Sequence, residues 1–465
     1  MDLVYGTRVV FFGPTNHGKS SLMGYMYADA NIDKNEMRRH INALKEDNPL
    51  CKDISPYVFS SFVSKKVPTE DTSEYGARYN TREYNIKDFL IPNDDYSVFI
   101  SLIDTPGFNF KNSGGKQKNR LRNQEYGISK ANIAIFCINI NDVNRKMELS
   151  DLSEMHKMWR AFHPNRKCII AFTQCDTVAY SQKEYNDAIR RVIQYIPEKE
   201  IVSFVPVAIE FDSLQGVNIL NKDKKIPWYT GKTLQEAIME RHFDLINNYV
   251  DLWHSPKTVF SIDKEIPNPR SNSGKVWRVF IENGSLSQGD KIHLTSVNVR
   301  RGVSHTAFAE IKEYRVDISL GDESEQAFAP KGAVITINLR NCSIDGKKRE
   351  KKYIEKSDHT IGIDGNTDFR YYNRFRISLV NTVDILFFSQ NQEMVVFLFG
   401  RALPVQIEEI DESTGSIIVK TNNNYVVAFP TDEDLLKINF FRKVVLRQSG
   451  KDNSYYSGFI SPIIP

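Results

Sequence analysis

The stretch Gly-Pro-Thr-Asn-His-Gly-Lys-Ser at residues 13–20 fits the phosphate-binding pattern G-x-x-x-x-G-K-[ST] at every fixed position. Glycines in such a loop let successive backbone N–H groups curl around a phosphate. The apolar run at residues 8–12 predicts a buried strand before the loop, and the residues from 21 onward predict a helix after it. A helix N-terminus favours anions, so the order strand, loop, helix predicts nucleotide binding at the edge of an α/β sheet.

The residues of this loop have distinct expected roles. Lys19 would bring a positive charge to the β- and γ-phosphates, and the Ser20 hydroxyl would bind Mg²⁺. The phosphate-binding residues are expected to be Gly13, Asn16, His17, Gly18, Lys19, Ser20 and Ser21.

The rest of the first half alternates strand-like and helix-like segments. Apolar runs lie at residues 98–103, 133–138, 168–172 and 202–207. Strands that are apolar on both faces are typical of parallel sheets covered by helices. Helices are expected between them, for example at 184–195, and a last one at 234–253. The series predicts a doubly wound, mostly parallel sheet in a phosphate-loop domain.

The pattern changes after about residue 255. The apolar runs become short, with a period of two, and Gly, Asn, Asp and Ser separate them. This pattern predicts all-β structure of the barrel or sandwich kind. Because about 210 residues are too many for one small barrel, we divide the chain into domains at 1–252, 253–365 and 366–465.

The composition sets limits on location and partners. The net charge of +3 is too small to argue for nucleic-acid binding by itself. Five cysteines without metal-ligand spacing favour buried thiols in a reducing compartment. No leader pattern and no apolar run near 18 residues is present in the sequence, so we expect a cytoplasmic protein without membrane association.

A second motif, Asp-Thr-Pro-Gly at residues 104–107, follows an apolar strand. In phosphate-loop GTPases, a D-x-x-G at this place holds Mg²⁺ through water, and the glycine N–H senses the γ-phosphate. We therefore expect Asp104 to be a metal-site residue and Gly107 to be a phosphate-binding residue.

A third motif, Thr-Gln-Cys-Asp at 173–176, fits the guanine-reading pattern [NT]-[KQ]-x-D. The Asp176 carboxylate would accept hydrogen bonds from guanine N1–H and the 2-amino group, which adenine does not offer in this pattern. Gln174 would lay its aliphatic stem along the base, and a backbone N–H after the next strand would meet the guanine O6. The expected guanine-binding residues are Thr173, Gln174, Asp176 and Ala208, and the expected ligands are GTP and GDP with Mg²⁺.

With these residues in hand, the chain resembles the translational GTPases of the elongation factor Tu and elongation factor 1-alpha type. The matching segments are His-Gly-Lys-Ser at 17–20, Asp-Thr-Pro-Gly at 104–107, and residues 226–238, 274–279, 283–290 and 441–447. The resemblance implies a GTP-binding domain followed by two β-barrels. It also implies a GTP-dependent switch whose partners are a ribosome, a tRNA or tRNA-like protein, and a nucleotide exchange factor, acting as a monomer or in a heterocomplex.

The chain departs from this family at two places. The family carries a histidine after D-x-P-G that positions the attacking water, whereas this chain has Phe108. A phenyl ring makes no strong hydrogen bond to water, so hydrolysis is expected to be slow or to need a partner's group. The alternative is that Phe108 packs outside the site. In switch I, either Thr81 or Arg78 stands where the family has its metal-binding threonine, and we favour Thr81.

Two other classes of function stay open at this point. Similar three-domain GTPases serve as regulatory subunits of sulfate adenylyltransferase, where GTP hydrolysis drives nucleotidyl transfer by a partner. A GTP-bound and nearly inactive scaffold or sensor is the other class, and Phe108 favours it.

Overall fold

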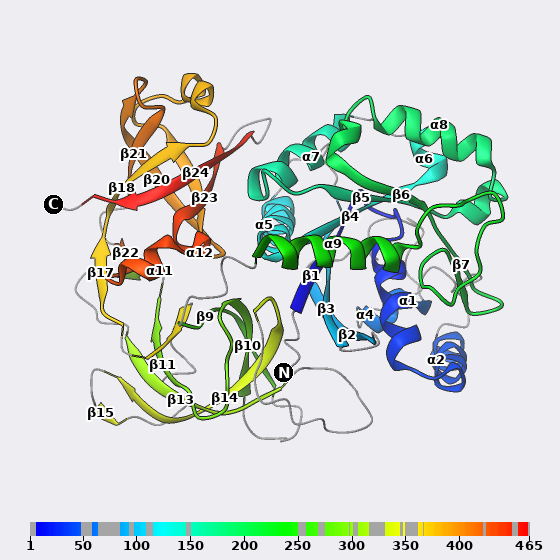
Figure 1. Ribbon diagram of the computed structural model, residues 1–465, viewed down its shortest axis with the longest axis horizontal. Helices are drawn as coiled ribbons and strands as arrows, with labels where there is room; N and C mark the ends of the chain where they lie inside the picture. The colour runs from blue at the N-terminus through cyan, green and yellow to red at the C-terminus, as the bar shows by residue number, and fades with distance from the viewer. Residues whose placement is uncertain are drawn as a thin grey trace.

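The computed structural model shows three bodies, which are an α/β unit and two β-barrels (Figure 1). The described residues are 6–47, 58–63, 84–92, 97–107, 115–145, 150–249, 257–267, 275–296, 298–300, 306–315, 331–344, 347–348, 361–365, 367–421, 425–448 and 454–463.

The first body is built on a six-stranded sheet in the order β2-β3-β1-β4-β5-β6. Its strands are β1 (Gly6–Phe12), β2 (Asn85–Pro92), β3 (Ser97–Asp104), β4 (Ile133–Asn139), β5 (Cys168–Thr173) and β6 (Ile201–Pro206). β2 pairs antiparallel with β3, and the other neighbours pair in parallel. The expected doubly wound, mostly parallel sheet is therefore confirmed.

Helices cover both faces of this sheet, because its central strands are apolar on both sides. In β1, Val9 and Phe11 join the core under one helical layer, and Val10 and Phe12 join the other. The first layer holds α1 (Lys19–Asn31), α2 (Lys34–Asp47), α4 (Ser60–Val63) and α9 (Leu234–Tyr249). The second holds α5 (Gly115–Lys130), α6 (Ile140–Arg145), α7 (Ser150–Phe162) and α8 (Gln182–Val192).

Short elements complete this body. They are η1 (Cys175–Val178), η2 (Glu198–Glu200) and the hairpin of β7 (Ala208–Glu210) and β8 (Gln215–Val217). α8 (Gln182–Val192) begins two residues before the helix expected at 184–195 and ends three residues before it. Ser181 caps its N-terminus by accepting a hydrogen bond from the Glu184 N–H.

The second body is a closed six-stranded barrel, in the order β10-β9-β16-β11-β13-β14 with β14 pairing back to β10. Its strands are β9 (Val259–Pro267), β10 (Lys275–Asn283), β11 (Lys291–Thr295), β13 (Ala307–Arg315), β14 (Val334–Ile344) and β16 (Ile361–Asp364). β15 (Lys347–Lys348) pairs antiparallel with the end of β14 as a hairpin.

The third body is a second closed barrel, in the order β18-β21-β20-β19-β23-β24. Its strands are β18 (Arg374–Leu379), β19 (Glu393–Leu398), β20 (Arg401–Asp411), β21 (Ser416–Thr421), β23 (Lys443–Gln448) and β24 (Ser454–Pro462). In β18, Phe375, Ile377 and Leu379 face the core and the residues between them are more exposed, as the period of two predicts. η4 (Thr382–Phe387), α11 (Glu433–Lys437) and α12 (Asn439–Arg442) connect its strands.

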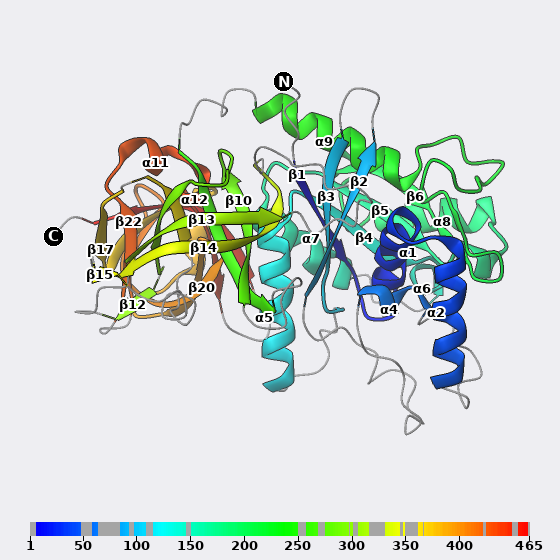
Figure 2. The same ribbon diagram turned by 90° about the horizontal axis from the view of Figure 1, so that it is seen from below.

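The two barrels share a small sheet, and the α/β body lies beside both of them. β12 (Asn298–Arg300) and β17 (Phe369–Tyr372) flank β22 (Tyr425–Pro430), so strands distant in sequence join the barrels. Figures 1 and 2 show α5 running along the boundary between the α/β body and the barrels. No helix of the described residues is both long and apolar enough to cross a membrane.

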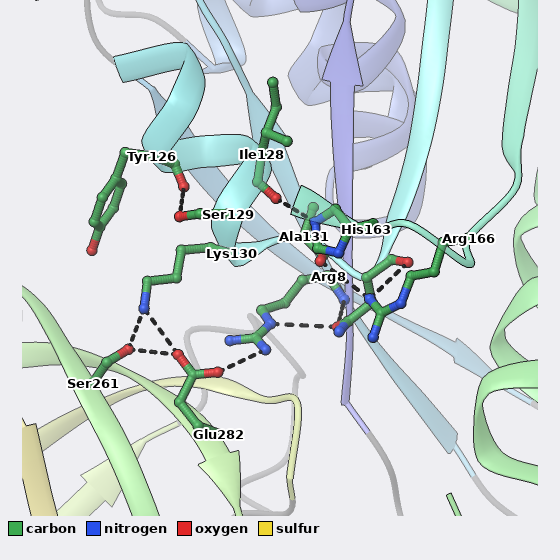
Figure 3. Close-up of polar contacts among 11 residues, drawn as sticks. Arg8, Tyr126, Ile128, Ser129, Lys130, Ala131, His163, Arg166, Ser261 and Glu282 are labelled. Carbon is green, nitrogen blue, oxygen red and sulfur yellow. Dashed lines mark hydrogen bonds and ion pairs between the residues drawn. The ribbon is translucent and has the colours of Figure 1, made fainter. Parts of the chain in front are cut away.

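A buried ion cluster joins the α/β body to the first barrel. Glu282 on β10 accepts from Arg8 on β1 at 3.1 Å and from Lys130 at the end of α5 at 2.9 Å. Lys130 also donates to Ser261 Oγ at 2.6 Å (Figure 3). Burial opposes ionisation of Glu282, yet the two cations lower the pKa of its carboxyl to about 2. The Glu282 carboxyl is therefore ionised at neutral pH, and its contacts with Arg8 and Lys130 tie the two bodies together.

We expect Glu282→Gln to destabilise the chain by about 3–5 kcal/mol, because it leaves two buried cations without their shared carboxylate. The measurement is urea unfolding at pH 7, followed by fluorescence. Because the folded pKa lies below the ordinary value of 4.5, the stabilisation is complete above about pH 5 and is lost as the pH falls toward 2. Glu154→Gln is the control, since Glu154 pairs with the exposed Lys157. Equal losses in the two variants would contradict this account.

Candidate nucleotide site

The loop at residues 13–20 lies between the end of β1 and the start of α1. Gly18 has a φ of 75°, which glycine adopts without strain. A Cβ at Gly13 would lie 2.3 Å from the carbonyl oxygen of Cys137 on the neighbouring strand. Backbone geometry thus requires glycine at both fixed positions of the motif. Ser21 follows in the first turn of α1, and Asn16 is exposed with a φ of 64°.

The side chains of the loop meet the second motif. Ser20 Oγ donates to Asp104 Oδ2 at 2.6 Å, and Lys19 Nζ donates to the Pro14 carbonyl at 2.6 Å. A Cβ on Gly107 would lie 2.5 Å from Thr15 Cα, so the backbone after β3 rests directly against the loop. Burial lowers the pKa of Lys19, and the nearby Asp104 carboxylate opposes that shift.

His17 anchors the loop to the end of β4. Its Nδ1 accepts from the Asn139 backbone N–H at 3.0 Å, so its proton is on Nε2, which lies 3.4 Å from Asp142 Oδ2. Burial, and then the charge of Lys19, lower the pKa of His17 to about 3. The imidazole is therefore neutral at physiological pH and holds the loop by hydrogen bonds.

The third motif contacts the phosphate loop directly. Thr173 Oγ1 donates to the His17 carbonyl at 3.0 Å, and Gln174 Nε2 donates to the Asn16 carbonyl at 3.4 Å. Gln174 Oε1 in turn accepts from Asn139 Nδ2 at 2.8 Å. The Gln174 amide is therefore held between the loop and β4.

Asp176 lies just beyond, in η1. The Cys175 N–H donates to the Val207 carbonyl at 3.2 Å, and the Val207 N–H donates to the Phe172 carbonyl at 2.8 Å. These two hydrogen bonds hold η1 beside Ala208, the first residue of β7. Asp176 lies at the surface. The loss of some of its hydration raises the pKa of its carboxyl, and backbone hydrogen bonds oppose that shift.

The three motifs therefore meet at the carboxyl ends of β1, β3 and β5, which run parallel in one sheet. The described residues include all of those that we expect to bind phosphate and guanine. Phe108, Thr81 and Arg78 lie outside them, so the water-positioning place and the switch I metal ligand remain predictions. Cys137, Cys168, Cys175 and Cys342 are buried free thiols, as expected, and Cys51 is outside the described residues.

Sequence reasoning missed two residues that support the site. Asn139 holds both His17 and Gln174, and its position at the end of an apolar strand is the signal that could have found it. Gln124 on α5 donates to the Pro106 carbonyl at 2.8 Å and so fixes the second motif. A polar residue within a helix gives no comparable signal.

A metal at this site would rest on hydroxyl and carboxylate oxygens. Mg²⁺ prefers such ligands and usually keeps several waters. The 2.6 Å contact between Ser20 Oγ and Asp104 Oδ2 places one oxygen of each kind side by side, which fits that ion. Among the residues that the structure describes, no group of three or more His, Cys, Asp or Glu could hold a metal by protein ligands alone.

Comparison with known proteins places this geometry in context. No model of a known protein family matches the chain. Elongation factor 1-alpha of Methanocaldococcus jannaschii is 22% identical over 296 residues, which cover 61% of this chain and 59% of that protein. Sulfate adenylyltransferase subunit 1 of Bacteroides fragilis is 21% identical over 334 residues, covering 71% of this chain and 60% of that protein. These matches span less than two thirds of each relative's length.

Solved structures resemble the whole chain in fold. The S. cerevisiae Ski7 GTPase-like domain was solved bound to GTP and bound to GDP with inorganic phosphate, with TM-scores of 0.68 and 0.67. In both cases the identity is 14%, and the match covers 99% of this chain and 98% of that one. The predicted arrangement of a GTPase-type domain and two β-barrels is therefore confirmed. The chain is therefore similar in sequence to elongation factor 1-alpha, and its fold resembles that of the Ski7 GTPase-like domain along nearly its whole length.

Proposed function

We propose that the chain binds GTP and GDP with Mg²⁺ and acts as a guanine-nucleotide-dependent switch in the cytoplasm. The observation that carries this proposal is the meeting of three motifs around one loop. Asp104 contacts Ser20 on one side, and Thr173 contacts His17 on the other. Calorimetry of the nucleotide-stripped chain with GDP, GTP and ATP is the test. Binding of guanine nucleotides but not ATP is expected, and no heat from either guanine nucleotide would contradict the proposal.

In this proposal the loop residues hold the phosphates and Lys19 neutralises them. Ser20 and Asp104 would hold Mg²⁺, with Thr81 as the switch I ligand. When bound, the ion would neutralise charge that develops on the β- and γ-phosphate oxygens. Asp176 would select guanine.

A path of contacts leads from Gly107, the residue expected to contact the γ-phosphate, to both barrels. Gln124 holds the Pro106 carbonyl, next to Gly107. The following residue, Glu125, is fully buried, accepts a hydrogen bond from Tyr455 Oη at 2.8 Å and forms an ion pair with Arg447 Nε at 2.8 Å, and both partners belong to the second barrel. At the end of the same helix, Lys130 contacts Glu282 of the first barrel. A nucleotide-dependent movement of residue 107 would therefore act on both barrels through α5.

A second contact joins the exit of switch I to the first barrel. Tyr84 Oη donates to Asp263 Oδ1, and Arg278 forms an ion pair with the same carboxylate. Tyr84 directly follows the segment that contains Thr81 and leads into β2. The first barrel would therefore also respond to the conformation of switch I.

We expect the isolated chain to hydrolyse GTP slowly, below about one turnover per minute, because Phe108 offers no hydrogen bond to an attacking water. Phe108→His restores the residue of the resembled family, and at least a roughly tenfold rise in single-turnover rate is expected. Phosphate release is measured at saturating GTP, with and without ribosomes. Brisk turnover of the unchanged chain would mean that another group positions the water.

The expected partners follow from the relatives. A ribosome, a tRNA or tRNA-like protein, and an exchange factor are proposed here. The match to sulfate adenylyltransferase subunit 1 favours a second candidate, a regulatory GTPase subunit of a nucleotidyl transferase. Affinity capture from cell extract in the presence of GTP separates the two. Ribosomes or tRNA support the first, and a nucleotidyl transferase supports the second.

A further inference from the structure

We propose that the cavity where the three domains meet is a second binding site, which takes a small, multiply phosphorylated anion. The cavity has a volume of about 500 Å³. The α/β body contributes Arg8 and Lys130, the first barrel contributes Glu282 and Lys331, and the second barrel contributes Lys443. Arg8 lies near the start of β1, and the loop at 13–20 follows the end of that strand, so the two sites are distinct.

The lining holds more cationic side chains than carboxylates. Six cationic side chains face two carboxylates, an excess of four positive charges when all are ionised. The cations are Arg8, Lys130, Arg166, Lys331, Lys437 and Lys443. The carboxylates are already engaged, because Glu282 pairs with Arg8 and Lys130, and Asp434 pairs with Lys437 at 2.9 Å. Arg166, Lys331 and Lys443 supply three of the four excess charges, and the cluster of Arg8, Lys130 and Glu282 supplies the fourth.

Two of the lining cations, Lys443 and Arg8, have buried donor groups that meet no carboxylate among the described residues. Lys443 Nζ donates to the neutral Phe162 carbonyl. The Arg8 side chain is 7% exposed, and its NH1 group finds no hydrogen-bond acceptor in the described part of the chain. Figure 3 shows the Arg8 and Lys130 side chains converging on Glu282. Buried donors without acceptors are costly, and a bound anion would satisfy them.

The lysine chemistry agrees with this geometry. Burial, and then the charge of Arg166, lower the pKa of Lys443 to about 7. Burial also lowers the pKa of Lys331 to about 8, against the attraction of Glu282. An anion in the cavity would favour the charged form of both amines.

The size and charge of the cavity define the ligand class. A volume of about 500 Å³ suits a small molecule and not a nucleic-acid duplex. Phosphate oxygens accept several charge-assisted hydrogen bonds. A chain of two or three phosphates carries about enough negative charge to balance the excess cations of the lining. Because all three domains line the cavity, such a ligand would hold their arrangement in place.

The test is calorimetric titration of the full chain with inorganic tripolyphosphate, and separately with ADP, in the presence of saturating GDP and Mg²⁺. Binding of tripolyphosphate is expected, and Lys443→Gln and Lys331→Gln should each weaken it by about tenfold. Lys443→Arg should retain the affinity because it keeps the charge. Lys157→Gln, on the exposed side of α7, is the control for bulk charge and should change little. Tighter binding of ADP would identify a nucleotide as the natural source of the phosphates.

Other results would overturn the proposal. Absence of heat from both probes would do so, as would equal losses in Lys157→Gln and Lys443→Gln. The Lys19→Ala chain should still bind tripolyphosphate, and loss of binding there would place the anion in the loop at 13–20. A single-stranded oligonucleotide that displaces tripolyphosphate and binds more tightly would replace the small ligand with RNA. Thermal unfolding of each variant shows that loss of binding does not come from loss of folding.

Discussion

Lys19→Ala is expected to lose measurable affinity for both GTP and GDP, a drop of about two to three orders of magnitude. Lys19 is 5% exposed, and its ammonium group is held over the loop by the Pro14 carbonyl at 2.6 Å. Burial lowers its pKa, so the folded chain holds a cation at a cost that a bound polyphosphate would offset. Alanine removes that cation and the hydrogen bonds it would give to the β- and γ-phosphates.

The measurement is calorimetric titration of nucleotide-stripped protein with each nucleotide. Lys45→Ala is the matched control, because Lys45 is an exposed lysine in the last turn of α2. It should bind as the unchanged chain does. Affinity that persists in a folded Lys19→Ala chain would show that the phosphates lie elsewhere, and the assignment of the loop would be wrong.

The loop and its surroundings could be predicted from the sequence because their signals are local. A few neighbouring residues encode the whole signal, which consists of the glycines at 13 and 18, the apolar strand before them and the helix after them. The two other motifs stand at strand ends, and parallel strands bring their carboxyl ends to one edge. Topology alone therefore places Asp104 and Asp176 near the same loop.

The contacts between domains could not be predicted in this way. Arg8 and Glu282 are 274 residues apart, and each is an ordinary charged residue in a strand. The shared sheet of β12, β22 and β17 joins segments whose pairing depends on how the two barrels pack. Nothing local in the sequence specifies such pairs, because their stabilisation arises only when the domains have folded and met.

Asp176→Asn is expected to change the nucleotide preference of the chain from guanosine to xanthosine nucleotides, because Asp176 is the residue expected to read the base. A carboxylate accepts from both guanine N1–H and the 2-amino group, whereas an amide offers one acceptor and one donor. The 2-amino donor then faces an amide N–H, while the carbonyl that replaces it in xanthine can accept from that N–H. A site that leaves such groups unpaired discriminates by several orders of magnitude.

The structure makes this substitution a clean one. Asp176 is exposed in η1, and the shape of that turn is set by backbone hydrogen bonds of Cys175 and Val207 that the change leaves intact. Competition between labelled GTP and unlabelled XTP, run on both proteins, measures the shift. Asp187→Asn on α8, where a partly exposed carboxylate pairs with the exposed Arg190, should keep the guanosine preference. Unchanged base selectivity in Asp176→Asn would remove Asp176 from the site, and the chain would then bind its nucleotide without reading the base through this carboxylate.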